Sequence, residues 1–97
     1  MAVYGIAQVN IHDREGYQAY IDGFRDLFFS YGGELLVVDD DVDVVEGEWP
    51  FTRMVITRFE SKEAFYKFYN CEEYQALIAV RQKSAVGNIV LVDEVVL

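Results

Sequence analysis

Three segments of this chain are apolar at consecutive positions, and this pattern most constrains how the chain can fold. They are Leu35-Leu36-Val37-Val38, Met54-Val55-Ile56 and Ile89-Val90-Leu91-Val92. A strand that alternates apolar and polar residues buries one face, whereas a strand that is apolar throughout is typical of a sheet buried on both faces. We therefore predict a sheet with two hydrophobic faces, each of which needs a cover.

The first third of the chain predicts a strand followed by a helix. Val3–Ile11 is rich in β-compatible residues, and it ends in an alternation of Val9 and Ile11 with polar residues. A helix should follow between Asp13, which can cap its first turn, and the pair Gly32-Gly33, which can end it. Its buried face is predicted to consist of Tyr17, Tyr20, Ile21, Phe24, Leu27, Phe28 and Tyr31.

The remainder repeats this arrangement. After the strand at residues 35–38 we expect an acidic turn, Asp39-Asp40-Asp41, and a short extended piece over Val42 to Glu46, before a strand at residues 54–59. Ser61 should cap a second helical stretch, which is expected to break near Asn70-Cys71 because Asn70 offers a fresh cap. The last strand is predicted at residues 89–92.

This order of elements, βαββαβ, predicts an α+β, ferredoxin-like fold in one domain over residues 1–97, with a four-stranded antiparallel sheet and helices on one face. Two helices can cover only one face of the sheet. The other face would expose more apolar surface than a soluble monomer usually shows. A second copy of the same sheet is the simplest cover, so we expect an obligate homodimer.

The composition limits which partners the chain can bind and indicates the cellular compartment in which it works. The chain has 97 residues, and its 17 acidic against eight basic residues give a net charge of -9. Nucleic acid and anionic membrane surfaces attract clustered Lys and Arg, so neither is expected to bind. No apolar run approaches a membrane span. Cys71 is the only cysteine and no signal-peptide pattern opens the chain, which together favour the cytoplasm.

Several short motifs in order resemble a known family. They are Tyr17 and Tyr20, Tyr31-Gly32-Gly33, Glu46-Gly47-Glu48-Trp49-Pro50, Arg53 before an apolar strand, Phe59-x-Ser61, Tyr69, Glu73-Tyr74-Gln75-Ala76-Leu77 and Arg81. Over nearly the whole chain this pattern is similar to the uncharacterised domain-of-unknown-function family 1330. The resemblance implies membership of the dimeric α+β barrel superfamily, in which two ferredoxin-like protomers close their sheets into a barrel.

The family name carries no settled activity. Its superfamily relatives include cofactor-free monooxygenases, lactone isomerases and haem-binding enzymes, so the fold selects no single chemistry. This chain also departs from the family pattern, with Glu34 where a basic residue is common and Asp39-Asp40-Asp41 in place of a glycine-rich turn. A relative that binds an anion through that basic residue would use a contact that this chain lacks.

The segment before the third strand holds the first candidate ligand-binding residues. Glu46, Trp49 and Arg53 place an acid, a flat aromatic ring and a planar cation within eight residues. Arg53 could hold a carboxylate through two parallel hydrogen bonds, and Trp49 could stack on a planar ligand. The alternative is structural, with Trp49 in the dimer interface and Arg53 paired with Glu46 or another acid.

His12 and the tyrosines are the other candidates. His12 is the only histidine, and with Asp13 to orient it a neutral imidazole could act as a general base; the alternative is that Asp13 only caps the helix. Tyr69 is a second candidate for proton transfer, and Tyr31 is a candidate ligand contact. Together the seven tyrosines predict an aromatic pocket with polar edges between helices and sheet.

We expect neither a metal nor a cofactor. Asp39-x-Asp41-x-Asp43 imitates the start of a calcium loop, but Val44 stands where that loop needs Gly and Pro50 where it needs Glu. One His and one Cys do not make a zinc site, and no Gly-x-Gly-x-x-Gly segment indicates a nucleotide.

Three functions stay open at this point. The first is binding of a small, partly apolar organic compound in a pocket between helices and sheet. The second is a cofactor-independent enzyme, an isomerase or monooxygenase, in which His12 or a tyrosine moves a proton while Arg53 stabilises negative charge. The third is a structural or regulatory homodimer without a ligand.

Overall fold

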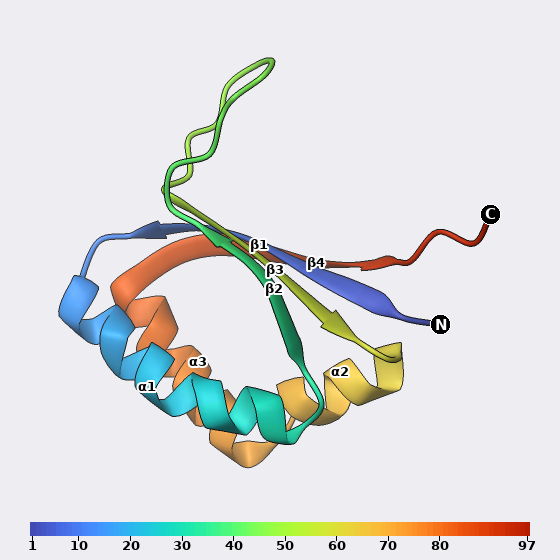
Figure 1. Ribbon diagram of the computed structural model, residues 1–97. Helices are drawn as coiled ribbons and strands as arrows, with labels where there is room; N and C mark the ends of the chain where they lie inside the picture. The colour runs from blue at the N-terminus through green and yellow to red at the C-terminus, as the bar shows by residue number, and fades with distance from the viewer.

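The computed structural model describes residues 1–97 as one four-stranded sheet covered on one side by helices (Figure 1). The strands follow the order β2-β3-β1-β4, and all neighbours are antiparallel. The elements are β1 (Val3–Ile11), α1 (Arg14–Ser30), β2 (Glu34–Asp39), β3 (Arg53–Phe59), α2 (Lys62–Tyr69), α3 (Glu72–Ser84) and β4 (Ala85–Asp93). The predicted α+β, ferredoxin-like order is confirmed, and β4 begins four residues earlier than its apolar run indicated.

Local capping explains where the helices begin. Asp13 accepts a hydrogen bond from the backbone N–H of Gly16, and Ser61 accepts one from that of Ala64, both at 3.1 Å. Both caps were predicted, and they satisfy backbone donors that the first turn leaves free. The third cap was assigned wrongly. Cys71 Sγ, not Asn70, accepts from Tyr74 N at 3.4 Å, because Asn70 still closes the last turn of α2.

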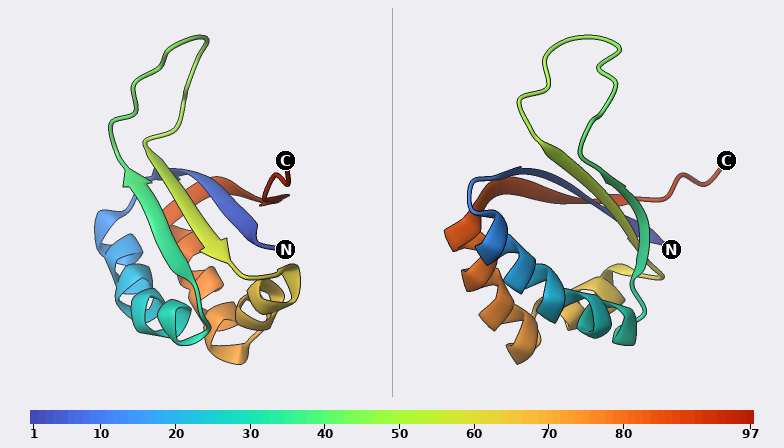
Figure 2. Two further views of the ribbon diagram at one scale, coloured as in Figure 1. Left: turned by 45° about the vertical axis from the view of Figure 1, so that its right-hand side comes forward. Right: turned by 60° about the vertical axis from the view of Figure 1, so that its left-hand side comes forward.

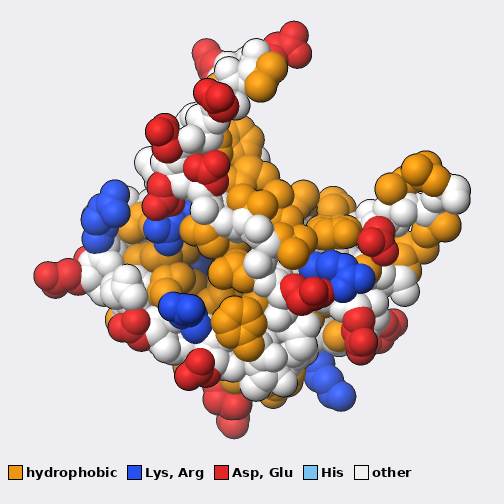
Figure 3. Space-filling view, in the orientation of Figure 1, with side chains coloured by type: hydrophobic (Ala, Val, Ile, Leu, Met, Phe, Trp, Pro, Cys, Tyr) orange, Lys and Arg blue, Asp and Glu red, His pale blue; other side chains and the backbone are white.

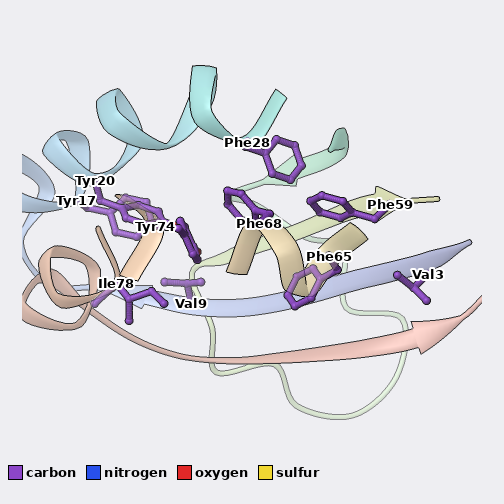
Figure 4. Close-up of a cluster of buried hydrophobic side chains, with 11 residues drawn as sticks. Val3, Val9, Tyr17, Tyr20, Phe28, Phe59, Phe65, Phe68, Tyr74 and Ile78 are labelled. Carbon is purple, nitrogen blue, oxygen red and sulfur yellow. The ribbon is translucent and has the colours of Figure 1, made fainter. Parts of the chain in front are cut away.

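The core lies between the sheet and the helices. In the antiparallel register Val3 faces Phe59, so both side chains point to the helix layer, where each is 1% exposed. Phe59 meets Phe28 of α1 edge-on at 5.4 Å between ring centroids and stacks on Phe68 of α2 at 5.8 Å. These rings occupy the centre of the cluster in Figure 4 and join α1, α2 and β3.

The other face of the sheet carries the alternate residues and has no helix over it. Ile6 of β1 pairs with Ile56 of β3 and with Val90 of β4 on this face. Val86, Val90 and Val92 remain 68%, 53% and 41% exposed. Figure 3 shows hydrophobic side chains gathered between the projecting loop and the C-terminal tail. The sheet is therefore apolar on both faces, as the consecutive apolar runs predicted.

Residues 40–52, which we call the arm, connect β2 to β3 and project away from the body (Figure 2). The extended piece expected over Val42 to Glu46 forms no strand, because no neighbouring strand pairs with it. The arm turns near Gly47, whose φ of 86° lies in the left-handed region that glycine adopts readily. At its base Asp40 and Arg53 form an ion pair.

Phe28→Ala and Phe29→Ala make a matched pair that tests this core. Phe28 is 1% exposed and Phe29 is 47% exposed on the same helix. Phe28→Ala should lower the free energy of unfolding by about 3 to 5 kcal/mol because it leaves a cavity among the rings. Phe29→Ala should cost about 1 kcal/mol or less. Urea denaturation at one protein concentration measures both, and equal losses would contradict the packing described here.

Candidate functional site

A cavity of about 590 Å³ lies between the sheet and the helices. Its lining comprises 26 residues, 17 of them hydrophobic. Small residues of the sheet, such as Gly5, Ala7 and Gly87, form one side of the cavity. Phe24, Phe68 and other aromatic rings of the helices form the opposite side. A predominantly apolar cavity of this volume is typical of small-molecule sites.

One end of the cavity carries a hydrogen-bonded group that we call the Arg81 corner, defined by Tyr20, Tyr74 and Arg81. The hydroxyls of Tyr20 and Tyr74 lie 2.7 Å apart, and Arg81 Nη1 donates to Tyr74 Oη at 3.1 Å. Tyr74 and Arg81 are seven residues apart, so two turns of α3 put them on one helix face. Figure 4 shows Tyr20 of α1 beside Tyr74.

Burial controls the ionisation of the two phenols. Tyr20 and Tyr74 are 5% and 3% exposed. Loss of hydration raises the pKa of each, and the hydrogen bond with Tyr20 and the positive charge of Arg81 only partly offset this for Tyr74. Both hydroxyls therefore keep their protons near neutral pH, where they act as hydrogen-bond donors and not as bases.

Arg53 lies at the mouth of the same cavity, where the arm joins β3. Its Nε and Nη2 donate to the two carboxylate oxygens of Asp40 at 2.6 and 2.9 Å. Its guanidinium carbon also lies 5.5 Å from the centre of the Tyr17 ring, within the range of a cation–π contact. The acid paired with Arg53 is Asp40 and not Glu46, because Asp40 directly follows β2 at the base of the arm.

The structure brings two of the predicted site residues together in this cavity and leaves four outside it. Arg53 and Tyr69 line the cavity. Glu46 is exposed on the arm, and Trp49 packs against Phe51 with its Nε1 buried and without an acceptor. Tyr31 borders a separate shallow depression beside α2, and His12 is exposed between β1 and α1. The ligand roles of these residues stay predictions.

The Arg81 corner was not singled out from the sequence as a site. The sequence predicts Tyr20 on the buried face of its helix and both Tyr20 and Tyr74 among the seven tyrosines around a pocket, whereas Arg81 enters only through the family resemblance. The seven-residue spacing of Tyr74 and Arg81 was the available signal, since it puts a phenol and a cation on one helix face. The contact with Tyr20, 54 residues away in sequence, has no local signal.

The chain has neither a cluster of metal ligands nor a helix that could cross a membrane. No group of three or more His, Cys, Asp or Glu side chains is arranged so that it could hold a metal ion. None of the helices has the length and apolar composition that a membrane crossing requires.

Comparisons with known proteins place the chain among similar folds. A family model described as "Domain of unknown function (DUF1330)" matches residues 2–95. No curated protein matches the chain. Among solved structures, the protein of unknown function RPA0582 from Rhodopseudomonas palustris has a TM-score of 0.82 at 17% identity, over 97% of this chain and 82% of that one.

Two other solved structures extend the comparison. SnoaB from Streptomyces nogalater, a cofactor-independent oxygenase, has a TM-score of 0.72 at 8% identity, over 99% of this chain and 95% of that one. The protein At3g17210 from Arabidopsis thaliana has a TM-score of 0.74 at 14% identity, over 98% and 97%. At these identities the likeness shows the fold and not the activity.

The Asp40–Arg53 pair predicts a pH dependence at the mouth of the cavity. The hydrogen bonds from Arg53 lower the pKa of Asp40 despite some opposing desolvation. The pair should therefore stabilise the fold above the unfolded aspartate pKa, about 3.9, and this contribution should be lost as pH falls through the lower folded value. Carboxyl NMR titration should show the pKa of Asp40 returning toward its ordinary value in Arg53→Gln. An unchanged pKa in that variant would contradict the assignment.

Proposed function

This chain belongs to the family described as Domain of unknown function (DUF1330), and from that premise we propose that it binds one small, largely apolar organic molecule per protomer. The ligand occupies the cavity between the helices and the sheet. The observation that carries the proposal is a cavity of about 590 Å³ with a mainly hydrophobic lining and polar groups gathered at one end. Apolar walls provide affinity and the few polar groups provide orientation.

The lining favours binding over acid–base catalysis. No Asp, Glu or His belongs to it, and the tyrosines Tyr20 and Tyr74 have raised pKa values. A general base works best with a pKa near the operating pH, and burial moves the pKa values of Tyr20 and Tyr74 away from it. His12, the one imidazole of the chain, is exposed between β1 and α1 and does not belong to the lining.

An enzyme without a cofactor is the second candidate, and one observation favours it. The Arg81 corner offers neutral phenols and a guanidinium, a combination that stabilises negative charge developing on a substrate oxygen. SnoaB, a cofactor-independent oxygenase, has a similar fold. Chemical change of a co-purified compound, followed by mass spectrometry in wild type and in Tyr20→Phe, separates this candidate from simple binding.

We also propose that the protein is a homodimer formed through the uncovered sheet face. The exposed valines of β4 and the apolar pairs of β1 and β3 form a continuous hydrophobic surface there. The same surface of a second copy would cover it with an equal apolar area. Such a contact is isologous, because both protomers use the same patch. The single thiol, Cys71, is half-buried and supports the reducing cytoplasm as the compartment.

Ala7→Phe tests the cavity as the binding site, and Ala19→Phe is its matched control. Ala7 lines the cavity, whereas Ala19 is exposed on α1 outside it. Titration with the neutral fluorescent dye N-phenyl-1-naphthylamine should show binding to wild type and to Ala19→Phe. Ala7→Phe should bind at least about tenfold more weakly, a loss of about 1.4 kcal/mol, because the new ring takes the ligand's space. Equal affinities in a folded Ala7→Phe would exclude this site.

Val90→Asp tests the dimer. Light scattering at micromolar concentration should give twice the mass of one chain for wild type, and the variant should be monomeric because it buries a carboxylate in an apolar interface. Ala19→Asp adds the same charge on the helix layer and should remain dimeric. A monomeric wild type would refute the proposed assembly.

A further inference from the structure

The charges of the cavity are opposite to those of the chain as a whole. The protein carries a net charge of -9 from 17 acids and eight bases. The cavity lining takes more than a quarter of the chain, yet it contains three arginines, Arg25, Arg53 and Arg81, and none of the acids. All charged side chains of the cavity are therefore positive, and a positive cavity favours an anionic ligand.

Arg81 is the partly buried cation of this set that lacks a counter-charge. The chain forms two ion pairs, Arg53 with Asp40 and Arg58 with Glu34. Arg25 is exposed to solvent. Arg81 is half-buried, lies 5.7 Å from the centre of the Tyr20 ring and makes one hydrogen bond, to Tyr74. A guanidinium has five N–H donors, so most of those on Arg81 have no protein acceptor.

The phenols of the Arg81 corner add one more free donor. Tyr20 and Tyr74 share a single hydrogen bond, and each hydroxyl carries one proton. Whichever hydroxyl donates in that bond, the proton of the other one is left over. Both residues are at least 95% buried and line the cavity, so an acceptor for this proton has to lie inside the cavity. Buried donors without an acceptor indicate a ligand that accepts hydrogen bonds.

We infer that the ligand is an apolar organic anion whose oxyanion lies at the Arg81 corner. This inference rests on the proposed function, and it adds the chemical class of the ligand. A carboxylate or similar oxyanion accepts from the guanidinium and from the free phenol proton, and such charge-assisted hydrogen bonds are strong. The apolar body of the ligand packs along Phe24, Phe68 and Tyr69 in the same cavity. An inorganic anion alone would leave most of this apolar volume unfilled.

Two dyes with the same ring frame provide the test. 1-Anilinonaphthalene-8-sulfonate carries one sulfonate, and N-phenyl-1-naphthylamine is its neutral counterpart. Fluorescence titration at pH 7 should give tighter binding of the sulfonate to wild type. Arg81→Gln should lower the affinity for the sulfonate dye by about 10- to 100-fold, the range for hydrogen bonds to charged groups. The affinity for the neutral dye should change by no more than about twofold in that variant.

Lys83→Gln is the matched control, because it removes the same charge from α3 at an exposed position outside the cavity. It should leave the affinity for both dyes near that of wild type. Should Arg81→Gln fail to fold, Tyr20→Phe is the second variant, because it removes one phenolic hydroxyl and keeps the ring. It should lower the affinity for the sulfonate dye by about tenfold and leave the affinity for the neutral dye unchanged. Ala7→Phe should weaken binding of both dyes by at least about tenfold, which would exclude the uncovered sheet face as their site.

The outcomes separate this inference from the function on which it rests. Equal wild-type affinity for the two dyes, or equal losses for both in Arg81→Gln, would overturn the anionic ligand while leaving an apolar binding cavity in place. Binding of neither dye to wild type, or unchanged binding in Ala7→Phe, would overturn the cavity as a binding site and the inference with it.

Discussion

Packing of aromatic rings between the helices and β3 is the interaction on which the rest of the structure depends. Phe28 and Phe68 contact Phe59 with centroid distances of 5.4 and 5.8 Å, and they hold the helix layer against the sheet at one end. Farther along, the sheet presents small residues such as Ala7 and Gly87 to the same space. Rings therefore fill the layer at one end, and a cavity remains where the sheet side chains are small.

The arrangement of charge follows from the same layering. Acids are concentrated on the outer surface and on the arm, where water hydrates them, whereas the cavity holds arginines whose long stems pack against rings. Asp40 compensates Arg53 at the mouth because the two ends of the arm meet there. Arg81 lies deeper, on α3, where no acid of the chain reaches it. The cation at the mouth is therefore paired within the chain, whereas the ligand proposed above would supply the counter-charge of Arg81.

Much of the fold could be predicted because its signals are local. The helix at Asp13, the break between α2 and α3 and the double-sided sheet follow from capping residues and periodicity over a few neighbours. An error arose where two local signals compete. Cys71 replaced Asn70 as the cap because α2 extends to Tyr69 and Asn70 closes its last turn.

The sequence by itself determined the order of elements, the two apolar faces of the sheet, the acidic charge and the family resemblance. Each of these depends on composition or on the spacing of residues that are close in the chain. The tertiary structure alone decided that Arg53 pairs with Asp40 and that Tyr20 meets Tyr74 and Arg81 across two helices. Such contacts join residues far apart in sequence, and they exist only once the helices are docked on the sheet.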